Sequence, residues 1–185
     1  MANENRLWKA LSVFLKYGFK KASMNDVARE IGISRQALYN QYKTKKALFD
    51  SLVKLVIVSA KEEAETALSL TNIPIQDRVL KAMDLWAGQF IDDLRNYPHG
   101  TEVISLCETG SVGDECHNEF LTMLEKTFTE EKIIPHSGSI QDLTNTFSYI
   151  MKGLLFSAKN RVEFNESMER AVRALLGEKN NSKTC

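Results

Sequence analysis

Apolar residues recur along most of this chain at the 3.6-residue spacing of α-helices. Leu7, Leu11 and Phe14 fall at positions i, i+4 and i+7, which places them on one face of a helix. This pattern predicts a first helix over residues 4–17 that ends at Gly18, because glycine readily adopts the positive φ that closes many helices.

Two short helices are predicted next. Ser23 precedes Asp26 by three residues, which is the capping-box pattern of a helix start, and Gly32 ends this helix. Ser34 is suited to cap the following helix, over residues 35–42. Two short helices joined by a tight glycine turn predict a helix-turn-helix.

Longer helices account for the rest of the chain. Thr44 is a suitable cap for a helix that continues to about Asn72, and we expect this helix to link two domains. Prolines and glycines then separate five further predicted helices, at residues 75–96, 100–109, 113–132, 139–160 and 164–177. The predicted fold is therefore all-α.

The composition is that of a globular protein, with 43% hydrophobic and 26% charged residues among 185. No apolar run approaches the roughly 18 residues of a membrane helix, and the N-terminus lacks the apolar stretch of a secretion signal. We expect a cytoplasmic protein without a membrane partner.

The three cysteines, Cys107, Cys116 and Cys185, are odd in number and irregularly spaced, which favours reduced thiols over a disulfide framework. Cys107, Cys116 and His117 do not have the spacing of a four-ligand zinc site, so no metal is expected. The sequence leaves open whether Cys107 or Cys116 is redox-active.

Charge is unevenly distributed along the chain. Residues 1–50 contain ten Lys or Arg and four Asp or Glu, a net charge of +6, and the remaining residues carry −6. A basic N-terminal segment on an acidic remainder is typical of a protein that offers one end to a polyanion.

The N-terminal residues form a family-specific pattern. It runs Ala10-Leu11-x-x-Phe14-x-x-x-Gly18-Phe19, Ser23-x-x-Asp26-Val27-Ala28-x-x-x-Gly32-Ile33-Ser34 and Leu38-Tyr39-x-x-Tyr42-Lys43-x-Lys45-x-x-Leu48. Residues 7–53 thereby resemble the DNA-binding domain of the TetR/AcrR family of bacterial transcriptional regulators, with Tyr42 where the family more often has Phe.

The resemblance implies three parts. Residues 1–48 would form a helix-turn-helix DNA-binding domain, and residues 49–179 a larger helical domain that binds a small effector and dimerises. Residues 180–185 would be a flexible tail.

The second short helix carries the candidate base contacts, because the second helix of a helix-turn-helix enters the major groove. Arg35 can contact guanine in a bidentate manner, and Gln36 or Gln41 can do so with adenine. The alternative is that these polar residues are only the solvated face of a helix. The family's base-contacting positions fall on Asn25, Arg35, Gln36, Ala37, Tyr39 and Gln41.

Two lysines begin the long fourth helix. Lys45 and Lys46 lie where the helix dipole disfavours cations, so stability does not account for them, whereas a bound phosphate does. The alternative is that they only raise solubility. The resemblance points to Lys45 as a phosphate ligand, and the full predicted set is Ser23, Tyr39, Lys43, Lys45 and Lys46.

Methionine and aromatic residues predict an apolar cavity for the effector. The same side chains suit a filled core equally well. The predicted pocket residues are Met83, Trp86, Phe90, Cys107, Phe120, Phe147 and Met151.

The predicted helix 139–160 is apolar on more than one side, so one face is expected to cover the domain core and the other a partner subunit. The alternative is a monomer with a deeply buried central helix. The predicted dimer contacts are Leu154, Leu155, Ala158, Val172, Leu175 and Leu176.

Together these features predict a homodimeric, ligand-responsive regulator, a repressor that leaves a palindromic operator when a small molecule binds. No cofactor is expected. An enzyme is disfavoured because the sequence has no nucleophile–base order, paired carboxylates or phosphate-binding glycine loop. A second alternative is an interaction protein that docks its helix-turn-helix on another protein.

Overall fold

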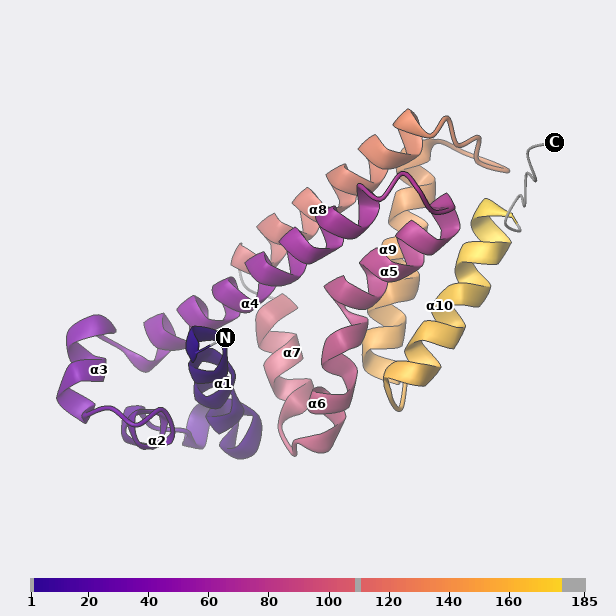
Figure 1. Ribbon diagram of the computed structural model, residues 1–185. Helices are drawn as coiled ribbons and strands as arrows, with labels where there is room; N and C mark the ends of the chain where they lie inside the picture. The colour runs from indigo at the N-terminus through magenta and orange to yellow at the C-terminus, as the bar shows by residue number, and fades with distance from the viewer. Residues whose placement is uncertain (1, 109–110, 178–185) are drawn as a thin grey trace. The chain divides into compact units, whose positions relative to one another are not determined.

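The computed structural model describes residues 2–108 and 111–177. Within these residues the chain is all-α, as predicted, and no described helix is long and apolar enough to cross a membrane. Figure 1 labels the helices: α1 (Ala2–Lys21), α2 (Met24–Glu30), α3 (Arg35–Gln41), α4 (Lys45–Leu68), α5 (Ile75–Trp86), the 3-10 helix η1 (Gly88–Phe90), α6 (Ile91–Asn96), α7 (Gly100–Glu108), α8 (Ser111–Glu130), α9 (Ile140–Ser157) and α10 (Arg161–Leu176).

The predicted helix starts are confirmed in the N-terminal region. The Ser23 side chain caps α2 as part of a complete capping box with Asp26. The Ser34 hydroxyl accepts the Ala37 N–H at 3.1 Å at the start of α3. Thr44 accepts the Ala47 N–H at 3.0 Å at the start of α4. Each cap satisfies an N–H group that has no partner within its helix.

The single helix predicted over residues 75–96 is wrong. The chain instead forms α5, η1 and α6, and the break lies at Ala87, whose φ of −134° is not helical. Gly88 then lies so close to Phe164 of α10 that a Cβ on it would be 2.8 Å from the ring. The close approach depends on a residue 76 positions away, so local periodicity did not predict it.

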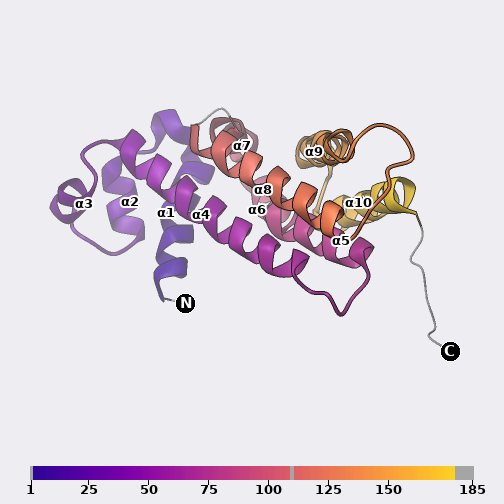
Figure 2. The same ribbon diagram turned by 90° about the horizontal axis from the view of Figure 1, so that it is seen from above.

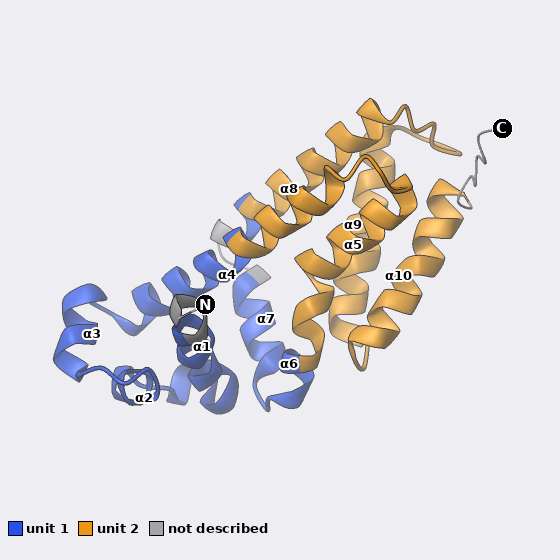
Figure 3. Cartoon of the chain, in the orientation of Figure 1, with its two compact units in different colours: residues 1–58, 93–115 blue, residues 59–92, 116–185 orange. Residues whose placement is uncertain are grey.

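The chain divides into two compact units (Figure 3). Unit 1 comprises residues 1–58 and 93–115, and unit 2 comprises residues 59–92 and 116–185. This division differs from the predicted boundary after residue 48, because the segment with α6 and α7 packs with the N-terminal helices. The predicted tail, residues 180–185, lies outside the described residues.

The core of unit 1 is built around aromatic rings. Phe14 is fully buried, and its ring meets those of Phe19 and Phe49 at centroid distances of 6.0 and 5.1 Å. Leu38 of α3 and Val103 of α7 belong to the same cluster. Helices α3 and α7 therefore share one hydrophobic core.

The core of unit 2 forms where α10 packs against both α5 and α9 (Figures 1 and 2). Four phenylalanines from three helices are fully buried there: Phe120 and Phe128 of α8, Phe147 of α9 and Phe164 of α10. Buried Arg78 of α5 donates from Nε to the carbonyl of Leu68 at 2.7 Å and pairs with Glu131 at 2.5 Å. Arg78 thus satisfies the last carbonyl of α4 while its own charge is neutralised.

Gly18 interrupts α1 near its end, with φ 75° and ψ 157°. A helix end was predicted at this glycine, whereas α1 continues beyond it to Lys21. A Cβ on Gly18 would lie 2.8 Å from both Glu102 Oε2 and His99 Nδ1, which belong to α7 and the residue before it. Glycine is therefore required at this position both for backbone conformation and for space.

We expect Gly18→Ala to lower the free energy of unfolding by about 2–4 kcal/mol, since alanine is strained at this φ and displaces Glu102 and His99. Gly177→Ala is the matched control, because Gly177 has φ 78° and ψ 175° but no neighbour within 4 Å of the added Cβ. Urea denaturation measures both variants. Equal losses would show that the crowding at Gly18 is unimportant.

Candidate nucleic-acid interface

The α2–α3 turn has the geometry of a helix-turn-helix. Gly32 adopts φ 71°, and the Ile33 N–H bonds to the Ala28 carbonyl at 2.9 Å, which closes the end of α2. Val27, Ala28 and Leu38 are buried, so both helices are anchored on the core of unit 1. The sequence thus fixes the short helix α3 by caps at its start and by one deeply buried leucine.

The outer face of α3 presents the predicted base contacts to solvent. Arg35, Gln36, Ala37 and Gln41 are exposed, and Tyr39 is half-buried. Asn25, from α2, is also exposed. All six predicted base-contacting residues therefore lie in the same unit, and none is buried in its core.

Side chains on α3 pair along the helix at i, i+4 spacing. The Arg35 guanidinium lies 5.3 Å from the centroid of the Tyr39 ring, a cation–π contact. Gln36 Nε2 donates to Asn40 Oδ1 at 3.1 Å. The i, i+4 spacing of these two amides is the sequence signal of such a pair.

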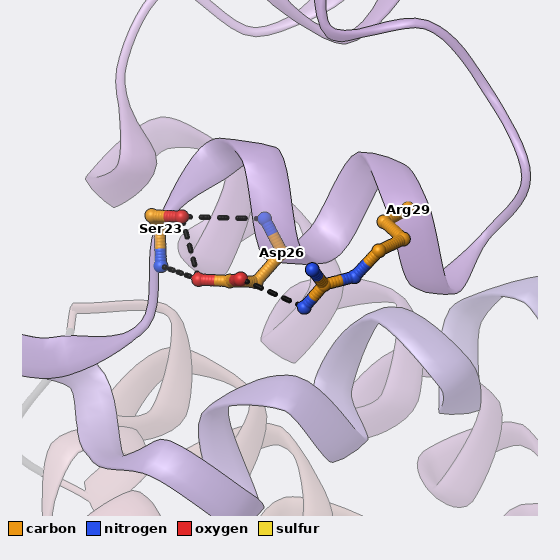
Figure 4. Close-up of polar contacts among 3 residues, drawn as sticks. All are labelled: Ser23, Asp26 and Arg29. Atoms are coloured by element: carbon orange, nitrogen blue, oxygen red, sulfur yellow. Dashed lines mark hydrogen bonds and ion pairs between the residues drawn. The ribbon is translucent and has the colours of Figure 1, made fainter.

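Ser23 is committed to its helix cap (Figure 4). Its hydroxyl donates to Asp26 Oδ2 at 2.6 Å and accepts the Asp26 N–H at 3.2 Å, while Arg29 pairs with Asp26 Oδ1 at 3.1 Å. The hydrogen bond from the Ser23 hydroxyl is the main reason that the pKa of Asp26 lies below its ordinary value, with Arg29 adding to the effect. The hydroxyl proposed for a phosphate is thus engaged within the protein.

Lys45 has a structural role, although its position in the first turn of α4 predicted no stabilising contact. Its ammonium donates to the carbonyls of Phe19, Lys20 and Ala22 at 2.6, 3.0 and 2.8 Å, and it lies 4.9 Å from the Phe19 ring centroid. These carbonyls belong to the end of α1 and the residue after it. The prediction that Lys45 does not contribute to stability was wrong, because this α4 residue donates to unpaired carbonyls at the end of α1.

Lys46 and Lys43 differ from Lys45. Lys46 is exposed and pairs with Asp50 one turn along α4, at 2.6 Å. Lys43 is exposed between α3 and α4. Of the predicted phosphate ligands, these two lysines and Tyr39 are the side chains to which the structure assigns no capping role.

The predicted pocket residues separate between the units. Met83, Phe120, Phe147 and Met151 are buried in the core of unit 2, and Trp86 stacks on Phe120 with a centroid distance of 4.8 Å. Phe90 is half-buried in the same unit. Cys107 packs on the core of unit 1, whereas the other predicted pocket residues lie in unit 2.

The predicted dimer contacts also divide into two groups. Leu154, Leu155, Leu175 and Leu176 are half-buried, whereas Ala158 and Val172 are each only 2% exposed. Both of these lie in the core of unit 2. Other large apolar side chains of α9 and α10 are exposed: Tyr149, Phe156 and Val162.

Titratable side chains in the described residues do not gather into a metal site, since no three His, Cys, Asp or Glu there are placed to hold an ion. One polar pair does lie beside the aromatic cluster of unit 2. His117 and Ser148 share a hydrogen bond of 2.8 Å, and the His117 ring lies 6.5 Å from that of Trp86.

A capped helix-turn-helix with an exposed polar recognition helix, followed by a second helical unit, defines the class of helix-turn-helix regulators. Residues 7–52 match the family model of bacterial regulatory proteins of the tetR family. An HTH-type transcriptional regulator of Bacillus subtilis, YezE, is 46% identical over 48 residues, which are 26% of this chain and 25% of that protein. Over this N-terminal segment the chain is similar to TetR-family transcriptional regulators.

Solved structures extend the similarity of fold to the whole chain. FadR of Bacillus subtilis, solved with stearoyl-CoA, is 14% identical with a TM-score of 0.70, covering 95% of this chain and 99% of that one. AibR, solved with isovaleryl coenzyme A and operator DNA, is 15% identical with a TM-score of 0.62, covering 96% and 99%. At these identities the comparison shows a similar fold and no more.

We expect Lys45→Met to lower the free energy of unfolding by about 2–3 kcal/mol, because three carbonyls at the end of α1 lose a charged donor. Lys46→Met, the adjacent control, removes only an exposed pair with Asp50 and is expected to cost about 0.5 kcal/mol or less. Chemical denaturation compares the two. A similar small loss in both would show that Lys45 does not hold α1.

Proposed function

We propose that this protein is a dimeric regulator that binds an operator through α3 and releases it when a small molecule binds unit 2. The observation that carries the DNA-binding part is the arrangement of α3. Arg35, Gln36 and Gln41 are exposed, while Leu38 holds the helix on the core at 1% exposure. A short, anchored helix with polar ends of this kind fits the major groove.

Electrostatics supports the same proposal. Residues 1–50 carry a net charge of +6, and exposed Lys43 and Lys46 lie directly after the recognition helix. We propose that these lysines and Tyr39 contact phosphates. Ser23 and Lys45 support the interface indirectly, since their side chains hold the ends of α2 and α1. In protein–DNA complexes, contacts to phosphates fix the position of the protein on the duplex. Contacts to base edges distinguish the sequence.

A homodimer would present two recognition helices to a palindrome, with half-sites about 34 Å apart on one face of the duplex. The exposed apolar residues of α9 and α10 support this. Tyr149, Phe156 and Val162 are 74%, 42% and 65% exposed, so two consecutive helices carry large apolar side chains that a partner subunit could cover. We propose that these residues, with Leu154, Leu155, Leu175 and Leu176, form the subunit interface.

Unit 2 is the proposed effector domain. Two regulators of the same fold were solved with acyl-CoA thioesters, which combine an apolar chain with a polar head. Unit 2 has both kinds of side chain close together, in the Trp86–Phe120 stack and the adjacent His117–Ser148 pair. A ligand that binds one conformation of the dimer better would shift its DNA affinity by that difference, so regulation needs no catalysis.

Selection from a random duplex library, followed by titration at several salt concentrations, tests DNA binding. Arg35→Ala is expected to cost about 1–3 kcal/mol on the selected duplex but little on unrelated DNA, because it removes a base contact. Lys43→Ala should weaken binding to all duplexes and reduce the salt slope by about 1. If the wild-type protein enriches no sequence and binds without salt dependence, the DNA-binding proposal fails.

Sedimentation equilibrium tests the dimer. Phe156→Glu or Tyr149→Glu should raise the dissociation constant by at least roughly a hundredfold, because an interface core does not tolerate an unpaired charge. Ile134→Glu is the matched control, since Ile134 is 89% exposed but lies in the loop between α8 and α9. If all three variants dimerise alike, another surface forms the dimer.

A further inference from the structure

We propose that Glu102 of α7 is a positioning residue for the DNA-binding helices, acting through the junction between α1 and α2, residues 18–23. This inference rests on the proposed DNA-binding function. Glu102 comes from the second sequence segment of unit 1, residues 93–115, which lies far from the helix-turn-helix in sequence. Its side chain is hydrogen-bonded to Phe19 and His99, so we infer that its effect passes through the backbone it holds.

The peptide groups of Phe19 are held from two sides. The Phe19 N–H donates to Glu102 Oε1 at 3.1 Å, and the Phe19 carbonyl accepts from Lys45 Nζ at 2.6 Å. Glu102 belongs to α7 and Lys45 to α4, so two helices from different parts of the sequence hold one residue. Because α1 is interrupted at Gly18, the Phe19 N–H has left the regular helix ladder and uses a side-chain acceptor instead.

Glu102 is itself oriented by its neighbours. Its Oε2 pairs with His99 Nδ1 at 2.8 Å, and the His99 backbone N–H donates to the Leu15 carbonyl at 3.1 Å. Gly18 lacks the Cβ that would collide with both side chains. The Glu102 carboxylate and the His99 imidazole therefore lie where a Cβ on residue 18 would crowd them. We call these three residues, His99, Glu102 and Gly18, the α7 clamp.

The α7 clamp lies directly before the DNA-binding helices. The Lys45 ammonium that binds the Phe19 carbonyl also donates to the Ala22 carbonyl, at 2.8 Å. The next residue, Ser23, caps α2. Exposed Asn25 follows in the first turn of α2. The direction in which α2 begins is therefore set by the junction, and α3 follows α2 after the tight turn at Gly32. When Glu102 is removed, the Phe19 N–H loses its acceptor, while Lys45 still binds the Phe19 carbonyl.

Packing alone does not explain Glu102. Its side chain is 38% exposed, so it contributes little to the hydrophobic core, and α7 is already anchored there by Val103. What Glu102 adds is an acceptor for one specific backbone N–H, 83 residues away in sequence. We therefore expect its removal to change the placement of α2 and α3 more than the stability of the fold.

The test compares full-length variants on the duplex that the wild-type protein selects. Glu102→Ala removes the acceptor, Glu102→Gln keeps an acceptor oxygen, and His99→Ala removes only the partner that orients the carboxylate. Glu119→Ala is the matched control, because Glu119 also forms an ion pair with a residue distant in sequence, Lys61, but lies in unit 2. Binding is measured well below each melting temperature, and amide hydrogen exchange is followed at residues 18–26.

Glu102→Ala is expected to weaken binding to the selected duplex roughly tenfold and to speed exchange at the Phe19 amide and the first turn of α2. Glu102→Gln should recover most of the affinity, His99→Ala should fall between them, and Glu119→Ala should bind like the wild type. Affinity and exchange that match the Glu119→Ala control in both Glu102→Ala and His99→Ala would overturn the inference while leaving DNA binding intact. A wild-type protein that binds no duplex would remove the proposed function and this inference together.

Discussion

The N-terminal unit depends on satisfying the backbone groups at the end of α1. A helix leaves its last carbonyls without intrahelical donors, and such groups are costly when they are removed from water. Here one ammonium, that of Lys45, serves three of those carbonyls, and one carboxylate, that of Glu102, serves the N–H that follows the interruption. The aromatic rings of Phe14, Phe19 and Phe49 exclude water around them. The helix-turn-helix begins where these contacts end.

Features that depend on near neighbours in sequence were predictable. Ser23 and Ser34 cap the helices that their positions indicated, because a cap involves a residue only three positions away. The positive φ of Gly18 and Gly32 follows from the same local logic. The exposed face of α3 was also predictable, because Leu38 is the deeply buried residue of a seven-residue helix and the polar residues around it then have to face outward.

Features that depend on distant contacts were not predictable. The break at Ala87 accompanies the close approach of Phe164 to Gly88, and the role of Lys45 depends on carbonyls more than twenty residues earlier in the sequence. Hydrophobic periodicity identified α9 as apolar on two faces but could not say which face the rest of unit 2 covers. Ala158 and Val172 were therefore assigned to a surface although they are buried, while exposed Tyr149 was passed over.

The composition of unit 1 has a practical consequence for building chimeric regulators. A fusion that transplants only the first 48 residues onto another effector domain carries Phe19 but leaves Glu102 and His99 behind. In the transplanted segment the Phe19 N–H would then lack its side-chain acceptor, and this amide lies just before α2. A fragment that keeps these contacts consists of two separate sequence segments. A host domain joined only to the N-terminal segment therefore has to supply a carboxylate at the equivalent place on its own helix.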